Sequence, residues 1–510
     1  MNFTEYTDLV SILEQSAESY GSRPAFIFEE EEISYGEFLR QAREVAAGLA
    51  ARGLTSGERV ALMLPNVPEF PIAYYGILLA GGVAVPLNIM FKSHEVRYIL
   101  DDCEAKFLIL WEGVEQQIGE IYPEGVGPQI VVSRTPAIEG HLAWEELVTP
   151  PPEGFLPHRP GLEDTAVILY TSGTTGHPKG AELTHLNLGS NAAASVLAGT
   201  VTPEDVVLGV LPFYHSFGQT VVMNASVLSG ACNLLLPKFE PQLVVDAIRK
   251  HQVTLFAAVP TMFKMLADWQ EEKTSLPSVR TCISGAAKLE IKVAEEFEQK
   301  FSLPIYEGYG LTEASPVVSF NPMDYRSKPG SVGLPVLDVD VRIVDDRGRD
   351  LPPGKEGEII VRGPNVMKGY LNRPEATKDT ILDGWLFTSD IGKIDDEGYL
   401  YILGRKKEMI IKGGFNIYPR EVENVIAFHP KVREVAVVGV PDPVQGEEVK
   451  AYVVTKPGKK VSRQELFEYC QEHMAFYKCP KYITFLRSLP KSSSGRVLKH
   501  KLYHRKTKRR

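Results

Sequence analysis

The chain has 510 residues, of which 44% are hydrophobic and 24% charged, a composition typical of a globular protein with more than one domain. Its formal net charge of -10 argues against general nucleic-acid binding. Five scattered cysteines without CxxC spacing indicate a reducing compartment, with no disulfide framework or zinc site. The first residues lack the basic start and apolar run of a signal peptide, and no run approaches about 18 apolar residues. We therefore expect a cytoplasmic protein of the size of an enzyme.

The first third of the chain alternates helical and strand patterns. Residues Ser34 to Glu37 resemble a capping box, and apolar residues then recur at helical spacing until Gly53. A buried strand is predicted over 59–64, and a second helix over 70–79. Such alternation predicts parallel sheets covered by helices.

The later parts of the chain follow a different pattern. A proline-rich connector over 150–160 precedes a predicted strand at 166–170. Short strands with turns between 330 and 369 predict a small β-rich subdomain or barrel, and a further unit begins near Gly404. The last fifteen residues hold eight lysines or arginines, which predicts a solvated tail.

A loop rich in glycine and hydroxyl groups follows the strand at 166–170. It reads Thr171-Ser-Gly-Thr-Thr-Gly-His-Pro-Lys179-Gly180. Glycines let backbone amides approach a phosphate, hydroxyls donate hydrogen bonds to it, and the lysine ammonium balances its negative charge. Only two residues separate Gly173 from Gly176, whereas a Walker loop places four between its first glycine and the Gly-Lys pair. The loop therefore predicts nucleotide binding of another kind.

Five ordered motifs together resemble one enzyme superfamily. They span 170–180, 213–218 (Phe-Tyr-His-Ser-Phe-Gly), 306–313 (Tyr-Glu-Gly-Tyr-Gly-Leu-Thr-Glu), 385–390 (Trp-Leu-Phe-Thr-Ser-Asp) and 404–408 (Gly-Arg-Lys-Lys-Glu). The chain resembles, nearly end to end, the adenylate-forming superfamily of acyl-CoA synthetases, luciferases and peptide-synthetase adenylation domains. Within it, the chain is most similar to bacterial medium/long-chain fatty-acid–CoA ligases.

The resemblance implies an α/β fold with two domains. A large N-terminal adenylation domain over 1–406 would hold two αβαβα-type layered subdomains and a small β-barrel. A small, mobile α+β domain would follow over 407–510, with its hinge near Lys407.

The resemblance also implies a two-step reaction. A carboxylate attacks the α-phosphorus of ATP to give an acyl-adenylate and pyrophosphate, and the thiol of coenzyme A then displaces AMP. ATP, Mg²⁺ and coenzyme A would be the co-substrates, with a fatty acid or other apolar carboxylic acid as the partner. Because acyl-adenylates hydrolyse, the site must exclude water. Transfer to a carrier protein instead of coenzyme A is an alternative.

The shared motifs supply a nucleotide site. Glu313 would ligate Mg²⁺ as a hard oxygen donor, and Thr312 would donate to the α-phosphate. Tyr309 would offer its ring to adenine, with a core tyrosine as the competing interpretation. Asp390 would accept from both ribose hydroxyls, supported by Arg405. The β- and γ-phosphates would be held by Thr171, Ser172, Gly173, Thr174, Thr175, Gly176 and Lys179. Further residues at the nucleotide would be Gly285, Ala286, Ala287, Glu307, Gly308 and Gly310.

The acyl site is predicted from a histidine and from the absence of acidic residues around it in the sequence. The resemblance makes His215 a wall or gate of the acyl pocket, while a satisfied core histidine is the alternative. No aspartate or glutamate occurs between Val206 and Phe239. An amino-acid substrate would bring an ammonium that needs a carboxylate partner, so we expect an apolar acid, and a fatty acid first.

The C-terminal unit would receive coenzyme A. Gly413 and Gly414 resemble the glycines that line a pantetheine tunnel, although an ordinary two-glycine turn is the alternative. Lys412 and Lys478 would meet phosphates of coenzyme A, unless they are simply solvated. The basic tail could contact an anionic membrane surface. The sequence leaves the oligomeric state open, a homodimer included.

One position departs from the family pattern. The family's late motif reads Pro-Lys-(Ser/Thr)-x-(Ser/Thr)-Gly-Lys, whereas this chain has Pro490-Lys-Ser-Ser-Ser-Gly-Arg496. Arginine keeps the positive charge but is planar and bulkier than an ammonium. We expect Arg496 to supply the adenylation charge at reduced efficiency. The alternatives are that Lys499 acts instead, or that the chain is a weakly catalytic homologue that binds acyl groups or nucleotides.

Overall fold

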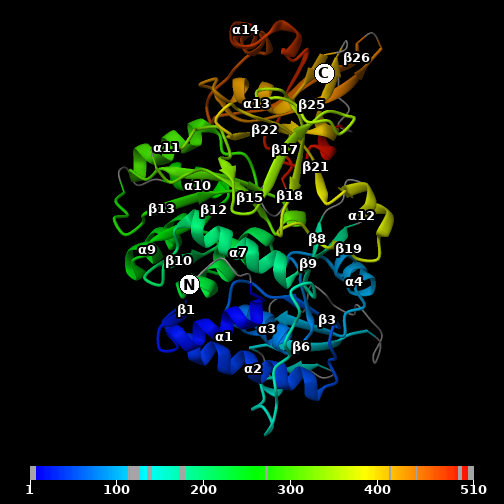
Figure 1. Ribbon diagram of the computed structural model, residues 1–510. Coiled ribbons are helices and arrows are strands. Elements are labelled where there is room, and N and C mark those ends of the chain that lie inside the picture. Colours follow the sequence, from blue (N-terminus) through cyan, green and yellow to red (C-terminus); the bar gives the residue numbers. More distant parts are fainter. Residues whose placement is uncertain are drawn as a thin grey trace. The chain divides into compact units, whose positions relative to one another are not determined.

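The computed structural model describes residues 7–112, 114, 127–134, 141–171, 178–269, 274–324, 326–412, 415–443, 445–491 and 497–503, with the side chains of 415, 416, 500 and 503 left aside (Figure 1). The chain divides into two compact units. The first comprises Met1–Leu289, Val293–Val341 and Val361–Leu386, and the second Glu290–Lys292, Arg342–Ile360 and Phe387–Arg510. The predicted domain boundary between 406 and 407 stays a prediction.

One sheet of the first unit has eight strands in the order β19-β9-β8-β4-β3-β5-β6-β7. The strands from β8 to β7 run parallel, and β9 and β19 extend this sheet antiparallel. The strands are β3 (Arg59–Met63), β4 (Val83–Pro86), β5 (Phe107–Trp111), β6 (Gln129–Ser133), β7 (Leu142–Ala143), β8 (Thr165–Thr171), β9 (Lys179–Thr184) and β19 (Gly369–Tyr370). The predicted parallel sheet and its strands at 59–64 and 166–170 are confirmed.

The second sheet of this unit has nine strands in the order β16-β15-β14-β13-β12-β10-β11-β1-β2. Its middle, from β14 to β1, is parallel, and β15, β16 and β2 are antiparallel at its edges. The strands are β1 (Pro24–Phe28), β2 (Glu31–Ser34), β10 (Val206–Gly209), β11 (Cys232–Leu235), β12 (Leu255–Ala258), β13 (Thr281–Ser284), β14 (Ile305–Gly310), β15 (Val317–Phe320) and β16 (Leu334–Pro335). Parallel strands present their carboxyl ends at one edge, where ligands bind in such sheets.

Helices cover both sheets, and α7 (His185–Gly199) contacts β9 of one sheet and β15 of the other. Helix α2 (Tyr35–Ala51) begins as predicted, because the Ser34 side chain accepts from the Glu37 N–H at 3.2 Å. Helix α3 (Glu69–Leu79) is buried along its whole length and approaches α2 closely, since a Cβ at Gly76 would lie 2.7 Å from Val45. The others are α1 (Leu9–Tyr20), α4 (Ser93–Asp102), α6 (Trp144–Leu147), the π-helix η1 (Gly218–Asn224), α8 (Ala225–Ser229), α9 (Pro241–His251), α10 (Pro260–Ala267), α11 (Ile291–Phe301), η2 (Thr312–Ala314) and α12 (Pro374–Thr380).

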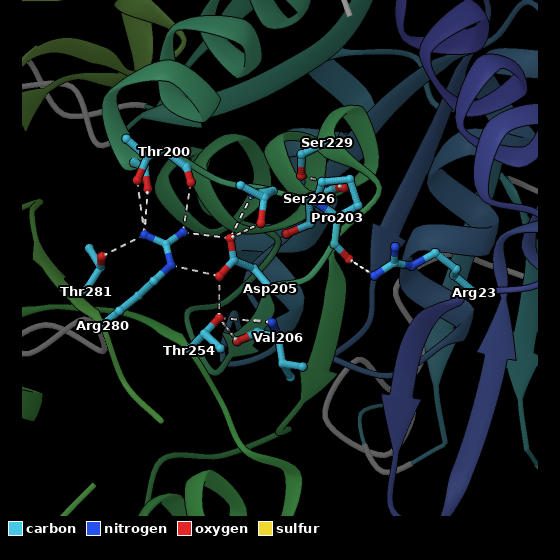
Figure 2. A network of polar contacts seen from close by, with 12 residues as sticks. Arg23, Thr200, Pro203, Asp205, Val206, Ser226, Ser229, Thr254, Arg280 and Thr281 are labelled. Atoms are coloured by element: carbon cyan, nitrogen blue, oxygen red, sulfur yellow. Dashed lines mark hydrogen bonds and ion pairs between the residues drawn. The ribbon is translucent and has the colours of Figure 1, made fainter. Parts of the chain in front are cut away.

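An ion pair between the buried Asp205 and the partly exposed Arg280 ties together the amino-terminal ends of three parallel strands. Figure 2 shows the Arg280 guanidinium facing the Asp205 carboxylate, to which it donates from Nε at 2.9 Å and from Nη2 at 2.6 Å. The Thr254 hydroxyl donates to the same carboxylate at 2.6 Å. These residues directly precede β10, β12 and β13, so the network fixes the edge opposite to the carboxyl ends.

A five-stranded sheet contains the two longer strands of the predicted β-rich region and continues beyond residue 369 to Arg405. Its order is β17-β18-β21-β20, and β22 pairs with β21. The strands are β17 (Asp340–Val344), β18 (Gly357–Arg362), β20 (Ile381–Leu382), β21 (Trp385–Ile394) and β22 (Leu400–Arg405).

The rest of the second unit has a sheet in the order β24-β23-β26-β25, with β27 on β26. Helices α13 and α14 contribute to a core on one face of it, while Leu489 and Leu502 pack on the other. The elements are η3 (Lys406–Glu408), β23 (Ile410–Lys412), β24 (Phe415–Ile417), α13 (Pro419–Ala427), β25 (Val432–Asp442), β26 (Gly446–Thr455), α14 (Arg463–His473), η4 (Phe476–Lys478), β27 (Tyr482–Phe485) and α15 (His500–Tyr503). Within the described ranges, no helix has the length and apolar character that a membrane span requires.

Candidate active site

The two ends of the glycine- and threonine-rich loop are held side by side. Thr171 ends β8, Lys179 begins β9, and the two are register partners in an antiparallel pair. The Lys179 ammonium lies 5.0 Å from the centre of the Tyr370 ring. The predicted phosphate ligands between these ends lie outside the described residues; they are Ser172, Gly173, Thr174, Thr175 and Gly176.

Helix α4 holds both flanks of this loop. Its Tyr98 hydroxyl donates to the Pro178 carbonyl at 3.0 Å, just after the loop. Its last residue, Asp102, accepts from the Tyr170 hydroxyl at 2.8 Å, just before the loop, and from Arg373 Nη2 at 2.6 Å. Burial raises the pKa of Tyr170, so its hydroxyl stays protonated and donates. We call Tyr98, Asp102, Tyr170 and Arg373 the loop clamp.

The Thr312–Glu313 motif follows the carboxyl end of β14. A Cβ at Gly310 would lie 2.1 Å from the Pro316 carbonyl oxygen, so only glycine allows this close backbone approach. The half-buried Glu313 accepts from the Tyr370 hydroxyl at 2.9 Å. Burial, together with the Glu313 charge, raises the pKa of Tyr370, which keeps the phenol protonated, so that its hydroxyl donates to Glu313.

The segment predicted at adenine lies at the carboxyl end of β13. Ala286 has φ +66°, a left-handed conformation, and Phe217 packs against Gly285, where a Cβ would lie 3.1 Å from the ring. Glu307 is buried, and its Oε1 accepts from the Leu289 N–H at 2.9 Å, which fixes the chain that follows Ala287. The Glu307 carboxylate thus holds the backbone of a neighbouring segment in place.

The ring predicted at adenine is not a core residue. Tyr309 lies next to Gly308 in β14 and is half-buried, which leaves part of its ring accessible. The contact with adenine itself stays a prediction.

The histidine motif lies beside the Thr312–Glu313 motif. The Ser216 and Thr312 hydroxyl oxygens are 3.5 Å apart, and the Thr220 hydroxyl donates to the Ser315 carbonyl at 2.8 Å. The Phe217 N–H donates to His215 Nδ1 at 3.3 Å, which places the ring proton on Nε2. His215 is exposed, yet desolvation by the surrounding protein lowers its pKa. A neutral, accessible imidazole does not fit the core-histidine alternative.

The predicted ribose ligands meet within the second unit. Asp390 in β21 and Arg405 in β22 are register partners, and Arg405 Nε lies 3.3 Å from Asp390 Oδ1. Asp390 is only 6% exposed. The preceding Ser389 has φ +59°, and its N–H donates to Glu358 at 3.1 Å, so the turn that orients Asp390 is anchored.

The lysines predicted at coenzyme A have carboxylate partners. Lys412 Nζ lies 2.5 Å from Glu448 Oε1, and Lys478 Nζ lies 2.6 Å from Glu421 Oε2. A phosphate would have to compete with these carboxylates, and the predicted roles stay predictions. Gly413 and Gly414 lie outside the described residues.

Arg496 also lies outside the described residues, whereas Lys499 is placed. Lys499 Nζ lies 2.9 Å from Glu423 and 3.1 Å from Glu408. Burial acts to lower the pKa of Lys499, but the two carboxylates outweigh it and the pKa is raised. These contacts give Lys499 a structural role that sequence reasoning missed.

Sequence reasoning also missed Tyr370 and the loop clamp. Tyr98 and Asp102 are four residues apart on α4, a spacing that puts two side chains on one helix face. That signal was available but weak. Nothing in the sequence pattern links Asp102 to Arg373, which is 271 residues away.

A magnesium ion fits the donor set. Glu313 has one oxygen bound to Tyr370, and the described residues give the other oxygen no partner. No group of three or more histidine, cysteine, aspartate or glutamate side chains in the described ranges could hold a metal. One carboxylate with phosphate oxygens and water is a usual magnesium environment, so Glu313 fits that role when nucleotide is bound.

Comparison with known proteins decides the family. A model of the AMP-binding enzyme matches residues 13–371, and a model of the AMP-binding enzyme C-terminal domain matches residues 421–496. The chain belongs to the AMP-binding enzyme family. This AMP-binding enzyme is an AMP-forming acid–thiol ligase, and its predicted α/β fold is confirmed.

Three relatives span nearly the whole AMP-binding enzyme. A long-chain-fatty-acid–CoA ligase of Bacillus subtilis (strain 168) is 38% identical over 535 residues, covering 98% of this chain and 94% of the relative. A feruloyl-CoA synthase of Amycolatopsis sp is 37% identical over 475 residues, covering 93% and 94%. The solved structure of o-succinylbenzoate coenzyme A synthetase from Bacillus subtilis, in complex with ATP and magnesium ion, has a TM-score of 0.85 at 33% identity and covers 96% of this chain and 98% of that chain.

Proposed function

We propose that this AMP-binding enzyme activates an apolar carboxylic acid, and a fatty acid first, to an acyl-adenylate, and transfers the acyl group to coenzyme A. ATP, Mg²⁺ and coenzyme A are its co-substrates. The observation that carries the choice of acid is the stretch from Val206 to Phe239, which has no aspartate or glutamate and contains the neutral His215. An ammonium or other cationic substrate group would find no counter-charge there.

The residues of the first unit act on the phosphates. The Lys179 ammonium, at the end of the loop that the loop clamp holds, pairs with the negative charge of the phosphates. The Thr312 hydroxyl, beside Ser216, donates to the α-phosphate. Glu313 supplies an oxygen to Mg²⁺, which neutralises phosphate charge when bound. His215 is an uncharged wall of the acyl site.

The residues of the second unit act on the ribose and on the developing charge. Asp390 accepts from the vicinal hydroxyls, and Arg405 keeps its carboxylate oriented. Arg496 supplies the positive charge of the adenylation step. Lys499 does not take over this task, because two carboxylates already neutralise it. The hinge near Lys407, where the C-terminal domain would move between the two half-reactions, is part of the same proposal.

AMP release measured across a panel of acids tests the function. The panel should contain saturated fatty acids of increasing length, ferulate, o-succinylbenzoate and a cationic amino acid, each with coenzyme A. We expect the highest kcat/KM for a fatty acid and no measurable AMP release with the amino acid. A preference for ferulate would replace the proposed substrate. Thioester formation on a carrier protein but not on coenzyme A would replace the acceptor, and ATP binding without acid-dependent pyrophosphate exchange would favour a binding homologue.

We also infer that the basic C-terminal segment contacts anionic lipid. Residues 496–510 hold eight lysines and arginines, of which Lys499 is paired with two carboxylates, and no aspartate or glutamate, although the whole chain has a net charge of -10. Several basic residues in a short segment attract an anionic surface, and a fatty acid partitions into the same membrane. Vesicles containing phosphatidylglycerol should sediment the protein at low salt but not at high salt. Vesicles of phosphatidylcholine should not, and equal sedimentation with both would contradict the inference.

A further inference from the structure

Tyr370 stands at the junction of two predicted ligand groups. Its hydroxyl donates to Glu313 Oε1 at 2.9 Å, and the face of its ring lies 5.0 Å from the Lys179 ammonium. One side chain therefore contacts the group predicted to bind Mg²⁺ and the group predicted to bind phosphate. None of the sequence motifs contained this tyrosine.

The backbone around Tyr370 is attached to both partners. Residue 370 pairs with Ala181 in the β19–β9 ladder, and the Leu371 N–H donates to the Gly180 carbonyl at 2.8 Å, next to Lys179. The Met367 N–H donates to the Glu313 carbonyl at 2.9 Å. The backbone that carries Tyr370 is thus tied by main-chain hydrogen bonds to the segments that carry Lys179 and Glu313.

The two contacts of Tyr370 have an electrostatic consequence. A lysine and a glutamate in the same half-buried region attract each other, and a direct pair would neutralise both. The described residues show no ion pair between Lys179 and Glu313. The ring face attracts the Lys179 ammonium, and the neutral hydroxyl stabilises the Glu313 carboxylate. Because the tyrosine carries no charge, both residues keep their full charge.

We propose that Tyr370 is a positioning residue that keeps Lys179 and Glu313 apart, so that each remains available to a different part of a magnesium–nucleotide complex. The proposal rests on the proposed function, because it takes Glu313 as the metal ligand and Lys179 as the phosphate ligand. Tyr370 acts through its contacts with these two residues.

Equilibrium binding of α,β-methylene-ATP, measured by calorimetry with and without Mg²⁺, tests the proposal. Tyr370→Phe removes only the hydroxyl and keeps the ring for Lys179. We expect it to weaken binding of the magnesium complex by about tenfold, as for loss of one hydrogen bond to a charged group. Binding of the metal-free analogue should change less than about twofold. The half-saturating Mg²⁺ concentration for AMP release should rise in the same proportion.

Removal of the ring gives an independent readout. Tyr370→Leu lets Lys179 pair with Glu313, so binding of the metal-free analogue should also weaken, by about tenfold. Adding Glu313→Gln to Tyr370→Leu removes the competing carboxylate and should restore metal-free binding. A tyrosine that only supports packing would not give this recovery.

Tyr401→Phe is the matched control, because the Tyr401 hydroxyl also donates to a carboxylate, that of Asp395, at 3.3 Å. It should leave both affinities unchanged. Equal binding of the magnesium complex by wild type and Tyr370→Phe would overturn the proposal while leaving the proposed function intact. A wild-type protein that binds the analogue neither with nor without Mg²⁺ would instead overturn both. If Tyr370→Leu does not fold, the Tyr370→Phe comparison decides alone.

Discussion

Asp102 offers the sharpest test of how the flanks of the predicted phosphate loop contribute to ATP binding. The Asp102→Ala substitution removes the acceptor of Tyr170 and of Arg373. The Tyr170 hydroxyl is left half-buried without its acceptor, which costs about 1–3 kcal/mol. The Arg373 side chain is 42% exposed and can be hydrated, so its lost ion pair adds only about 0–1 kcal/mol. The clamp is thus weakened by about 1–4 kcal/mol.

The assay separates ATP binding from general stability. If about 1.4 kcal/mol of that loss is felt at the loop, the KM for ATP rises roughly tenfold. The KM for the acid should stay within about twofold, because the Asp102 carboxylate contacts Tyr170 and Arg373, neither of which belongs to the predicted acyl site. Steady-state AMP release at varied ATP and varied acid measures both constants.

The neighbouring aspartate provides the matched control. Asp101 lies on the same helix, and its ion pair with Arg97 at 3.6 Å is exposed on both sides. Asp101→Ala should change neither constant. The reasoning would be refuted if Asp102→Ala lowered the melting temperature but left the KM for ATP at the wild-type value, or if Asp101→Ala raised that KM equally.

Three further predictions address the catalytic charge, the ribose ligand and the framework. Arg496→Lys should speed acid-dependent pyrophosphate exchange, by up to about 10²–10³-fold if the arginine is a misplaced donor. Lys499→Ala should mainly lower the melting temperature. The opposite pattern would make Lys499 the catalytic group. Asp390→Ala should raise the KM for ATP by about tenfold or more with little change in the KM for the acid, and an unchanged KM for ATP in steady-state assays would remove it from the site. Arg280→Met should destabilise the protein in urea by about 2–3 kcal/mol, below the range for fully buried pairs because Arg280 is partly exposed. The folded-state pKa of Asp205 is held below its usual value, because its hydrogen bonds outweigh the effect of its burial. The stabilisation by this pair is therefore present above about pH 4 and is lost as the pH falls through the lowered pKa. An Arg280→Met variant with the same acid dependence as wild type would contradict this.

Local sequence determined the elements and the motifs of this protein. The capping residue Ser34 and the helical spacing after it gave α2, and the apolar run before Thr171 gave β8, because such patterns depend on neighbours only a few residues away. The composition of the glycine–threonine loop predicted phosphate binding for the same reason. The absence of acids from Val206 to Phe239 could likewise be read directly, and it carries the proposed substrate class.

Only the tertiary structure decided which distant side chains serve these motifs. The contacts of Asp102 with Arg373 and of Glu313 with Tyr370 join residues 271 and 57 positions apart. Pairings of this kind depend on strand order and on helix packing, which no local periodicity encodes. The burial of Lys499 between two carboxylates is a second case, since an isolated lysine in a sequence gives no sign of its partners. The sequence thus predicted a phosphate-binding loop, and the fold supplied the side chains that contact its two flanks and the tyrosine that contacts Lys179 and Glu313.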